Sequence, residues 1–204
     1  MHLPIKRVWF QNFMFDITEE VFEPSEDSFL FAENLDVRKG SDVLDLGTGC
    51  GILGILAAQK ARHVLSVDIN PYAICCAKQN ALLNHVQNNM SFLRSDLLIA
   101  LNTNVLFDLI LFNAPYLPSE SRELQTWLGY AWAGGATGRD VIDRFIPRVV
   151  MHLKPFGRVL LLQSSLTGLE LTIKRFCDCG LSAVVKAESK LPFFETIHLI
   201  EASA

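Results

Sequence analysis

Three aspartates stand at the ends of short apolar runs, where their carboxylates could bind a ligand. Asp45, Asp68 and Asp96 each come at or just after the end of such a run. In open α/β sheets, ligands bind at the carboxyl ends of the strands. Each acid alone is typical of a helix cap or a turn, but three at successive strand ends predict an acidic pocket. Such a pocket favours a ligand that carries positive charge.

A glycine-rich loop, Asp45-Leu46-Gly47-Thr48-Gly49-Cys50-Gly51, lies between the first strand of this series and the helix that follows. Glycines there let a ligand approach the backbone closely. The dinucleotide fingerprint G-x-G-x-x-G would need its third glycine at position 52, where the chain has Ile52. Asp45 would repel a pyrophosphate and attract an amino group. The loop therefore does not favour a dinucleotide.

The two later acids fit the other parts of a nucleoside cofactor. Asp68 has the position of the acid that binds ribose hydroxyls in such folds, and Asp96 suits the adenine amino group. A sulfonium and an amino group are both cationic, so an acidic pocket suits them. The sequence predicts S-adenosylmethionine as the cofactor.

The stretch from Leu106 to Tyr116 joins a buried strand to a polar tetrapeptide. The residues from Leu109 to Phe112 are continuously apolar, as in a parallel strand covered on both faces. Asn113-Ala114-Pro115-Tyr116 follows, and Pro115 ends the strand because proline has no backbone N–H. An ordinary proline-containing turn is the alternative interpretation. The acidic pocket predicted upstream favours a substrate site.

The rest of the chain supplies the elements that position these residues. A cap at Ser25 is predicted to open a helix whose first turn carries Glu26 and Asp27. Residues 1–22 are predicted to form an extended aromatic-rich arm. One doubly wound α/β domain over residues 1–204 is expected. Its predicted strands are 42–46, 63–67, 90–93, 106–112, 157–163, 181–186 and 195–200, and further helices are predicted at 51–60, 71–83, 141–154 and 169–179.

Composition excludes several classes of protein. The chain has 204 residues, half of them hydrophobic, and a net charge of −4, which argues against broad attraction to nucleic acid. Its five cysteines form no C-x-x-C pair, and its five histidines show no metal-ligand spacing, so we expect reduced thiols and no metal. We expect no signal peptide and no membrane span, and a cytoplasmic location.

The motifs DLGTGCG, VDIN, SDLL and NAPY, in this order, resemble class I methyltransferases of the HemK/PrmC type, which modify glutamine in peptide-chain release factors. The segments VFEPSEDS and AWAGGATGRDVIDRF are similar to the short archaeal and eukaryotic branch called HemK2. The resemblance implies a Rossmann-like sheet of strand order 3-2-1-4-5-7-6. In such a sheet the last strand is antiparallel and helices cover both faces.

The resemblance also implies roles for individual residues. Asn113, Ala114, Pro115 and Tyr116 fall on the substrate tetrapeptide, whose second residue is usually proline. Ala114 keeps the backbone carbonyl but holds the loop less rigidly than proline would. The implied cofactor contacts are Ser28, Asp45, Gly47, Gly49, Asp68, Asp96, Leu97 and Asn113.

The expected reaction is methyl transfer to the side-chain amide nitrogen of glutamine, in the Gly-Gly-Gln segment of a class 1 release factor. The Asn113 side-chain oxygen and the Ala114 carbonyl would accept hydrogen bonds from the planar NH2 group. The alternatives are an exocyclic amine of RNA or DNA, a protein lysine, or a catalytically silent subunit that binds the cofactor. An acidic chain without a separate target-recognition domain argues against nucleic acid, and an intact Asn113 and Tyr116 argue against a silent subunit.

A partner is implied as well. The branch acts with a small zinc-binding activator protein. The weak strand from Met90 to Leu93 would be an exposed edge of the predicted sheet, suited to strand addition. We expect the activator to dock there.

Overall fold

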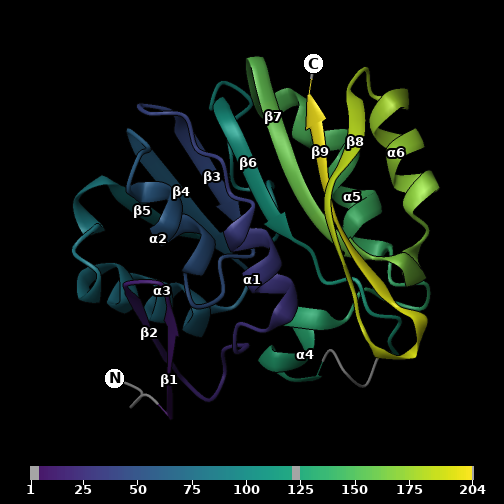
Figure 1. The fold of residues 1–204 in the computed structure, drawn as a ribbon. Coiled ribbons are helices and arrows are strands. Elements are labelled where there is room, and N and C mark those ends of the chain that lie inside the picture. Colours follow the sequence, from purple (N-terminus) through teal and green to yellow (C-terminus); the bar gives the residue numbers. More distant parts are fainter. Residues whose placement is uncertain (1–4, 121–124, 204) are drawn as a thin grey trace.

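The computed structural model describes residues 5–120 and 125–203; for Phe193 it describes the backbone alone. Its main sheet has seven strands in the order β5-β4-β3-β6-β7-β9-β8 (Figure 1). Counted from β3 as the first strand, this is the predicted order 3-2-1-4-5-7-6, and the predicted antiparallel last strand is β9. The strands are β3 (Asp42–Leu46), β4 (His63–Asp68), β5 (Met90–Arg94), β6 (Phe107–Asn113), β7 (Leu153–Ser164), β8 (Ser182–Lys190) and β9 (Thr196–Ser203).

Helices cover both faces of the sheet, as predicted (Figure 1). α1 (Glu26–Glu33), α2 (Ile52–Ala58) and α3 (Pro71–Leu83) pack on one face. α5 (Asp140–Val149) and α6 (Leu169–Asp178) pack on the other, and the short α4 (Trp127–Trp132) lies near the carboxyl ends of the parallel strands. The described 3-10 helices are Gln87–Asn89, Val150–His152, Ser165–Thr167 and Pro192–Phe194.

The apolar run of β6 is buried because both faces of the central strand are covered. Leu109 and Leu111 belong to the core under α1, α2 and α3, whereas Ile110 and Phe112 belong to the core under α5 and α6. Successive side chains of a strand point to opposite faces, so a strand covered on both sides is apolar throughout. This packing fixes the position at which the chain leaves the sheet at Asn113.

The predicted N-terminal arm is a hairpin of β1 (Lys6–Phe10) and β2 (Phe13–Ile17). Asn80 of α3 exchanges hydrogen bonds with the backbone N–H and C=O of Asp16, and Asn84 does the same with Met14. Two side-chain amides thus replace a neighbouring strand and satisfy the backbone of β2. The hairpin leads directly into Val21 and the segment that precedes α1.

Several predicted boundaries differ from those of the structure. β6 extends through Asn113, β7 begins at Leu153, and β8 continues to Lys190. No element was predicted between residues 117 and 136, where α4 forms. Ser25 does occupy the N-cap position of α1, but its hydroxyl makes no capping bond. It donates instead to Asp27 Oδ1 at 2.8 Å, so the predicted cap is wrong in its chemistry.

Candidate functional site

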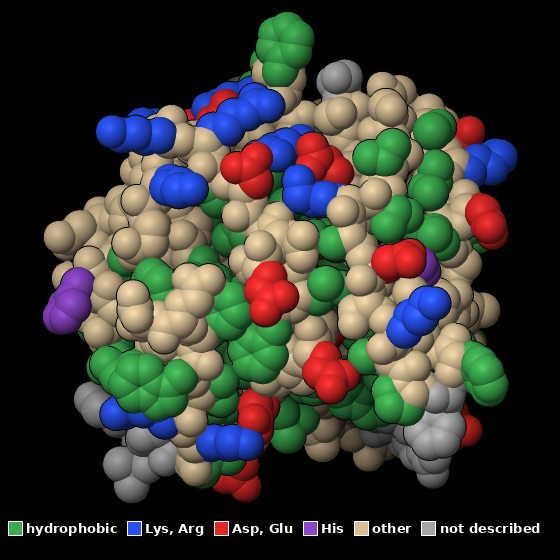
Figure 2. Space-filling view, viewed as in Figure 1, with side chains coloured by type: hydrophobic (Ala, Val, Ile, Leu, Met, Phe, Trp, Pro, Cys, Tyr) green, Lys and Arg blue, Asp and Glu red, His purple; other side chains and the backbone are tan. Residues whose placement is uncertain are grey.

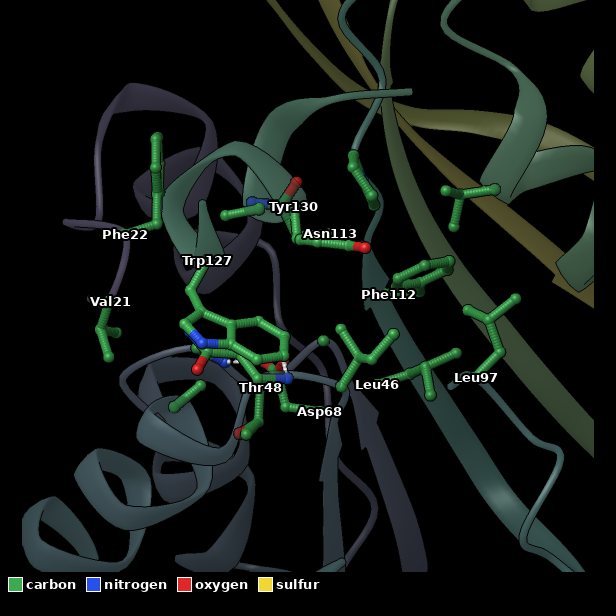
Figure 3. A pocket seen from close by; sticks show the side chains of 18 of the residues that line it. Val21, Phe22, Leu46, Thr48, Asp68, Leu97, Phe112, Asn113, Trp127 and Tyr130 are labelled. Atoms are coloured by element: carbon green, nitrogen blue, oxygen red, sulfur yellow. Dashed lines mark hydrogen bonds between the residues drawn. The ribbon is translucent and has the colours of Figure 1, made fainter. Parts of the chain in front are cut away.

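A cavity of about 550 Å³ lies at the carboxyl ends of β3, β4, β5 and β6. In Figure 3, Phe112 and Leu97 lie on one side of it, Val21 and Phe22 on the other, and Trp127 between them. The predicted site residues that line the cavity are Ser28, Gly47, Gly49, Asp68, Asp96, Leu97, Asn113 and Pro115. The predicted residues Asp45, Ala114 and Tyr116 are not among its lining residues.

The glycine-rich loop reaches the cavity through backbone conformations that favour glycine. Gly47 and Gly49 have φ values of 66° and 54°, in the left-handed region. The Gly49 N–H donates to Asp68 Oδ2 at 2.9 Å, and the Thr48 N–H donates to the Val67 carbonyl at 3.0 Å. These bonds join the loop after β3 to the end of β4, so the two form one wall of the cavity.

Asp45 lies behind this loop and is only 1% exposed. Its Oδ2 accepts hydrogen bonds from Thr48 Oγ at 2.5 Å and from the Gly54 N–H at 3.0 Å. Burial raises the pKa of this carboxyl from 3.8 to about 7, against the opposing effect of these two bonds. The structure therefore places Asp45 as a support of the loop, and its predicted direct contact with the cofactor stays a prediction.

This pKa shift predicts a pH dependence of stability. The folded chain binds the Asp45 proton more tightly than the unfolded chain, so the contribution to stability is complete below about pH 4 and is lost as the pH rises to about 7. Asp45→Asn cannot ionise. Over that pH range its free energy of unfolding should rise relative to wild type by on the order of 4 kcal/mol. Urea unfolding of both proteins at a series of pH values measures this difference, and a difference independent of pH would contradict the assignment.

Asp68 stands at the end of β4 with both carboxylate oxygens held. Oδ2 accepts from Gly49, and Oδ1 accepts from the Asn70 N–H at 2.9 Å. Burial raises the pKa of Asp68, and these backbone bonds oppose the rise. Each oxygen retains a further lone pair for a ligand hydroxyl, which is what binding of a ribose diol requires.

Asp96 and Leu97 form the far end of the cavity, after β5. Asp96 Oδ2 accepts a 2.5 Å bond from Arg144 Nη2 of α5. Leu97 has a φ of 50°, an uncommon conformation for a branched residue, and is 8% exposed. Strain of this kind concentrates at ligand sites. The predicted contact of this dipeptide with a ligand stays a prediction.

Charge on the cavity wall is mainly negative. Among the lining residues, the carboxylates of Asp68, Asp96 and Asp140 face one guanidinium, that of Arg144. Basic side chains gather instead at the opposite end of the sheet, where the parallel strands begin, as the upper part of Figure 2 shows. The exposed members of that group include Arg38, Lys39, Lys60 and Arg62. The cavity thus suits a ligand with positive charge, as the sequence predicted.

Two aromatic residues of α4 also border the cavity. Trp127 and Tyr130 line it, and their ring centroids are 5.6 Å apart. The guanidinium of Arg94, at the end of β5, lies 5.8 Å from the centre of the Trp127 ring, within cation–π range. The Trp127 end of α4 therefore lies beside the end of β5.

The position of Trp127 provides an optical test of the cavity. S-adenosylhomocysteine, the demethylated form of the predicted cofactor, should change the tryptophan fluorescence when it binds beside this ring. Trp127→Phe should remove most of the change, whereas Trp9→Phe should retain it because Trp9 is 60% exposed on the hairpin and does not line the cavity. A titration followed by emission spectra measures both, and an unchanged signal in Trp127→Phe would place the ligand elsewhere.

The tetrapeptide is held by a residue that sequence reasoning did not assign to the site. Asp27, 9% exposed on α1, accepts 3.2 Å bonds at Oδ2 from Asn113 Nδ2 and from the Tyr116 hydroxyl. Its Oδ1 accepts from the Ser25 hydroxyl and from the N–H and hydroxyl of Ser28. The carboxylate of Asp27 is thus the centre that joins α1 to the end of β6.

This network fixes the orientation of the Asn113 amide. Because Nδ2 donates to Asp27, the side-chain oxygen is left as an acceptor for a ligand N–H. Burial, followed by the neighbouring Asp27, raises the pKa of Tyr116, so its hydroxyl stays protonated and can donate. Ala114 is 2% exposed and packs its methyl group in the core beside α5 and α6. The predicted role of its carbonyl stays a prediction.

The sequence gives little local signal for the site residues that were not predicted. Asp27 was noticed only as one of two acids at a helix start, where the helix dipole explained it. Trp127 and Tyr130 fall in a segment without helical periodicity, and Arg144 is one of several cations between residues 139 and 158. Among the described residues, no group of three or more His, Cys, Asp or Glu could hold a metal ion. No described helix is long and apolar enough to cross a membrane.

Comparisons with known proteins identify the family and several relatives of the chain. The family model described as methyltransferase small domain matches residues 23–128. A Methanocaldococcus jannaschii protein, provisionally named a protein N5-glutamine methyltransferase, is 47% identical over 178 residues, which cover 86% of this chain and 88% of that protein. Methyltransferase HEMK2 of Homo sapiens is 36% identical over 149 residues, covering 68% and 69%. A solved structure, the E. cuniculi Mtq2-Trm112 complex, is described as responsible for methylation of the eRF1 translation termination factor. One of its chains matches this chain with a TM-score of 0.71 and 25% identity, and the match covers 90% of this chain and 98% of that one.

Proposed function

The chain belongs to the methyltransferase small domain family, in its HemK2-like branch, and we propose that it methylates the side-chain amide nitrogen of a glutamine in a protein. The observation that carries this proposal is the fixed Asn113 amide, whose nitrogen is occupied by Asp27 and whose oxygen is left to accept. The chain is a methyltransferase enzyme. The proposed methyl donor is S-adenosylmethionine.

The residues present fit this donor. The lining carboxylates of Asp68, Asp96 and Asp140 suit its positive charges, and the left-handed backbone of Gly47 and Gly49 allows close approach. We propose that Asp68 binds the ribose hydroxyls and that Asp96 and Leu97 meet the adenine. When bound, the donor supplies a methyl group on a positively charged sulfur, which leaves as a neutral thioether. Ser28 and Asn113 would complete the contacts near the transferred group.

The acceptor amide needs positioning more than it needs a base. Its nitrogen lone pair is delocalised into the carbonyl, so the site must hold the planar NH2 group with that lone pair directed at the methyl carbon. The Asn113 side-chain oxygen and the Ala114 carbonyl are proposed to accept its two N–H bonds, and Tyr116 to cover its face. As the nitrogen–carbon bond forms, one of the two amide protons leaves the nitrogen and passes to solvent water. Preorganised acceptors of this kind lower the barrier through orientation and electrostatics.

We propose a class 1 peptide-chain release factor as the protein substrate and its Gly-Gly-Gln segment as the site. Relatives named as release factor glutamine methyltransferases and the described activity of the Mtq2-Trm112 complex support this choice. Such a substrate would place the chain in the cytoplasm. We also propose that residues 1–204 act as one catalytic domain, because the hairpin and the sheet share a core.

Label transfer tests the acceptor. The chain and the activator proposed below are incubated with methyl-labelled S-adenosylmethionine. Parallel reactions contain one acceptor each: release factor, release factor with asparagine in place of the Gly-Gly-Gln glutamine, RNA, or a lysine-rich protein. We expect label only in the unchanged release factor, because the shorter asparagine amide would not reach the acceptor clamp, the Asn113 side-chain oxygen and the Ala114 carbonyl. Label confined to RNA or to lysine would overturn the proposal, and no transfer to any acceptor would favour a silent subunit.

An activator is proposed at the edge of the sheet. β5 pairs only with β4 among the described strands, so its outer backbone groups are available for strand addition. The E. cuniculi relative was solved in complex with Trm112, which supports a small partner protein, and we propose that it binds zinc. Size-exclusion chromatography of the chain with a Trm112-type protein should give a one-to-one complex. Separate elution at micromolar concentrations would contradict this placement.

A further inference from the structure

An ion pair lies in the cavity wall at the end proposed for the adenine base. Arg144 of α5 places Nη2 2.5 Å from Oδ2 of Asp96, and both side chains line the cavity. The pair is partly exposed, with 49% of the Arg144 side chain and 39% of the Asp96 side chain accessible. A surface pair of this kind adds little to stability. Its position in the cavity wall suggests a different role.

The bond leaves Asp96 with one oxygen for a ligand. Oδ2 is held by Arg144, whereas Oδ1 makes no hydrogen bond with the described residues. A carboxylate oxygen is an acceptor only, so it can pair with the exocyclic amino group of adenine but not with the carbonyl of a 6-oxopurine. Fixing the carboxylate rotamer before binding removes the entropy that a free side chain would lose.

Arg144 itself projects from a well-anchored helix. The apolar side of α5, Ile142, Phe145 and Ile146, is fully buried. At the helix start, the Arg139 guanidinium donates to the Thr167 carbonyl and, at 3.0 Å, to Thr172 Oγ. A group on such a helix holds its partner more precisely than one on a loop.

We propose that Arg144 is a positioning residue that orients Asp96 toward the purine amino group and thereby sets the preference for adenine. The inference rests on the proposed function, since it assumes that the cavity binds an adenosine-containing cofactor. Arg144 is not required to touch the transferred methyl group or the acceptor. Its effect should therefore appear in cofactor binding and purine selectivity.

Calorimetric binding of S-adenosylhomocysteine and S-inosylhomocysteine tests this role. The wild-type chain should prefer the adenine compound by at least about tenfold, because the 6-oxo group offers Asp96 no donor at the position of the adenine amino group. Arg144→Ala should weaken binding of the adenine compound by about tenfold and the inosine compound much less, which lowers the ratio. Arg144→Lys should retain part of the preference. Arg148→Ala, an exposed change on the same helix, should match wild type.

The outcomes separate this inference from the proposed function. Equal weakening of both compounds by Arg144→Ala would show a merely structural role and overturn the inference, while the proposed function would stand. An unchanged affinity for both would overturn it as well. Failure of the wild-type chain to bind S-adenosylhomocysteine would overturn the proposed function, and the inference with it. A thermal melt of each variant confirms that the folded state is compared.

Discussion

Replacement of Asn113 by alanine is expected to lower kcat by about a thousandfold while the affinity for S-adenosylhomocysteine changes little. The change removes the acceptor oxygen that would orient the substrate amide, and it leaves Asp68, Asp96 and the glycine loop in place. Steady-state methyl transfer gives kcat, and calorimetry gives the cofactor affinity. The two measurements together distinguish a lost acceptor clamp from a lost cofactor site.

The control for this variant is a surface asparagine remote from the cavity. Asn104 is exposed in the loop before β6 and does not line the cavity; its backbone N–H donates to the side-chain oxygen of Asn102. Asn104→Ala should therefore transfer methyl groups at the wild-type rate. Wild-type transfer by Asn113→Ala would contradict the assignment of Asn113 to the reaction.

Asp27→Asn is expected to have the second-largest effect, a loss of about a hundredfold in kcat. Both carboxylate oxygens of Asp27 accept from donors, two at Oδ2 and three at Oδ1. An asparagine must turn its NH2 toward one of these groups of donors, which leaves buried polar atoms unpaired. If the NH2 faces Asn113, the Asn113 amide must reverse and present its nitrogen to the substrate.

A neighbouring acid on the same helix provides the comparison. Glu26 is exposed one residue before Asp27, so Glu26→Gln removes a charge from the helix start without altering the network. It should keep the wild-type kcat. A loss of rate shared equally by both variants would assign the effect of Asp27 to the helix dipole, and an unchanged rate in Asp27→Asn would remove Asp27 from the clamp.

Much of the fold followed from local pattern. The apolar run before Asn113 predicted a central strand because such a strand is covered on both faces, and Pro71 marked the start of α3. The strand order itself came from family resemblance, and the structure confirms it. Boundaries were less accurate because tertiary pairing extends a strand beyond its apolar run, as β7 shows by continuing back to Leu153.

The parts that were missed depend on contacts between distant segments. Asp27 acquires its role only when α1 meets the end of β6, and nothing in the local sequence separates it from Glu26. For Asp45 the motif gave no sign of the structural role that the fold adds, in which Gly54 packs tightly against its carboxylate and donates to it; its predicted contact with the cofactor stays a prediction. Periodicity cannot show which of two polar residues faces a partner that lies elsewhere in the chain.

The most direct test of the central claim is tandem mass spectrometry of release factor after incubation with the chain, the proposed activator and S-adenosylmethionine. We predict one added methyl group on the side-chain amide nitrogen of the Gly-Gly-Gln glutamine, absent when Asn113→Ala replaces the wild-type chain. A methyl group found instead on lysine, or a release factor that stays unmodified while RNA in the same reaction is methylated, would contradict the account.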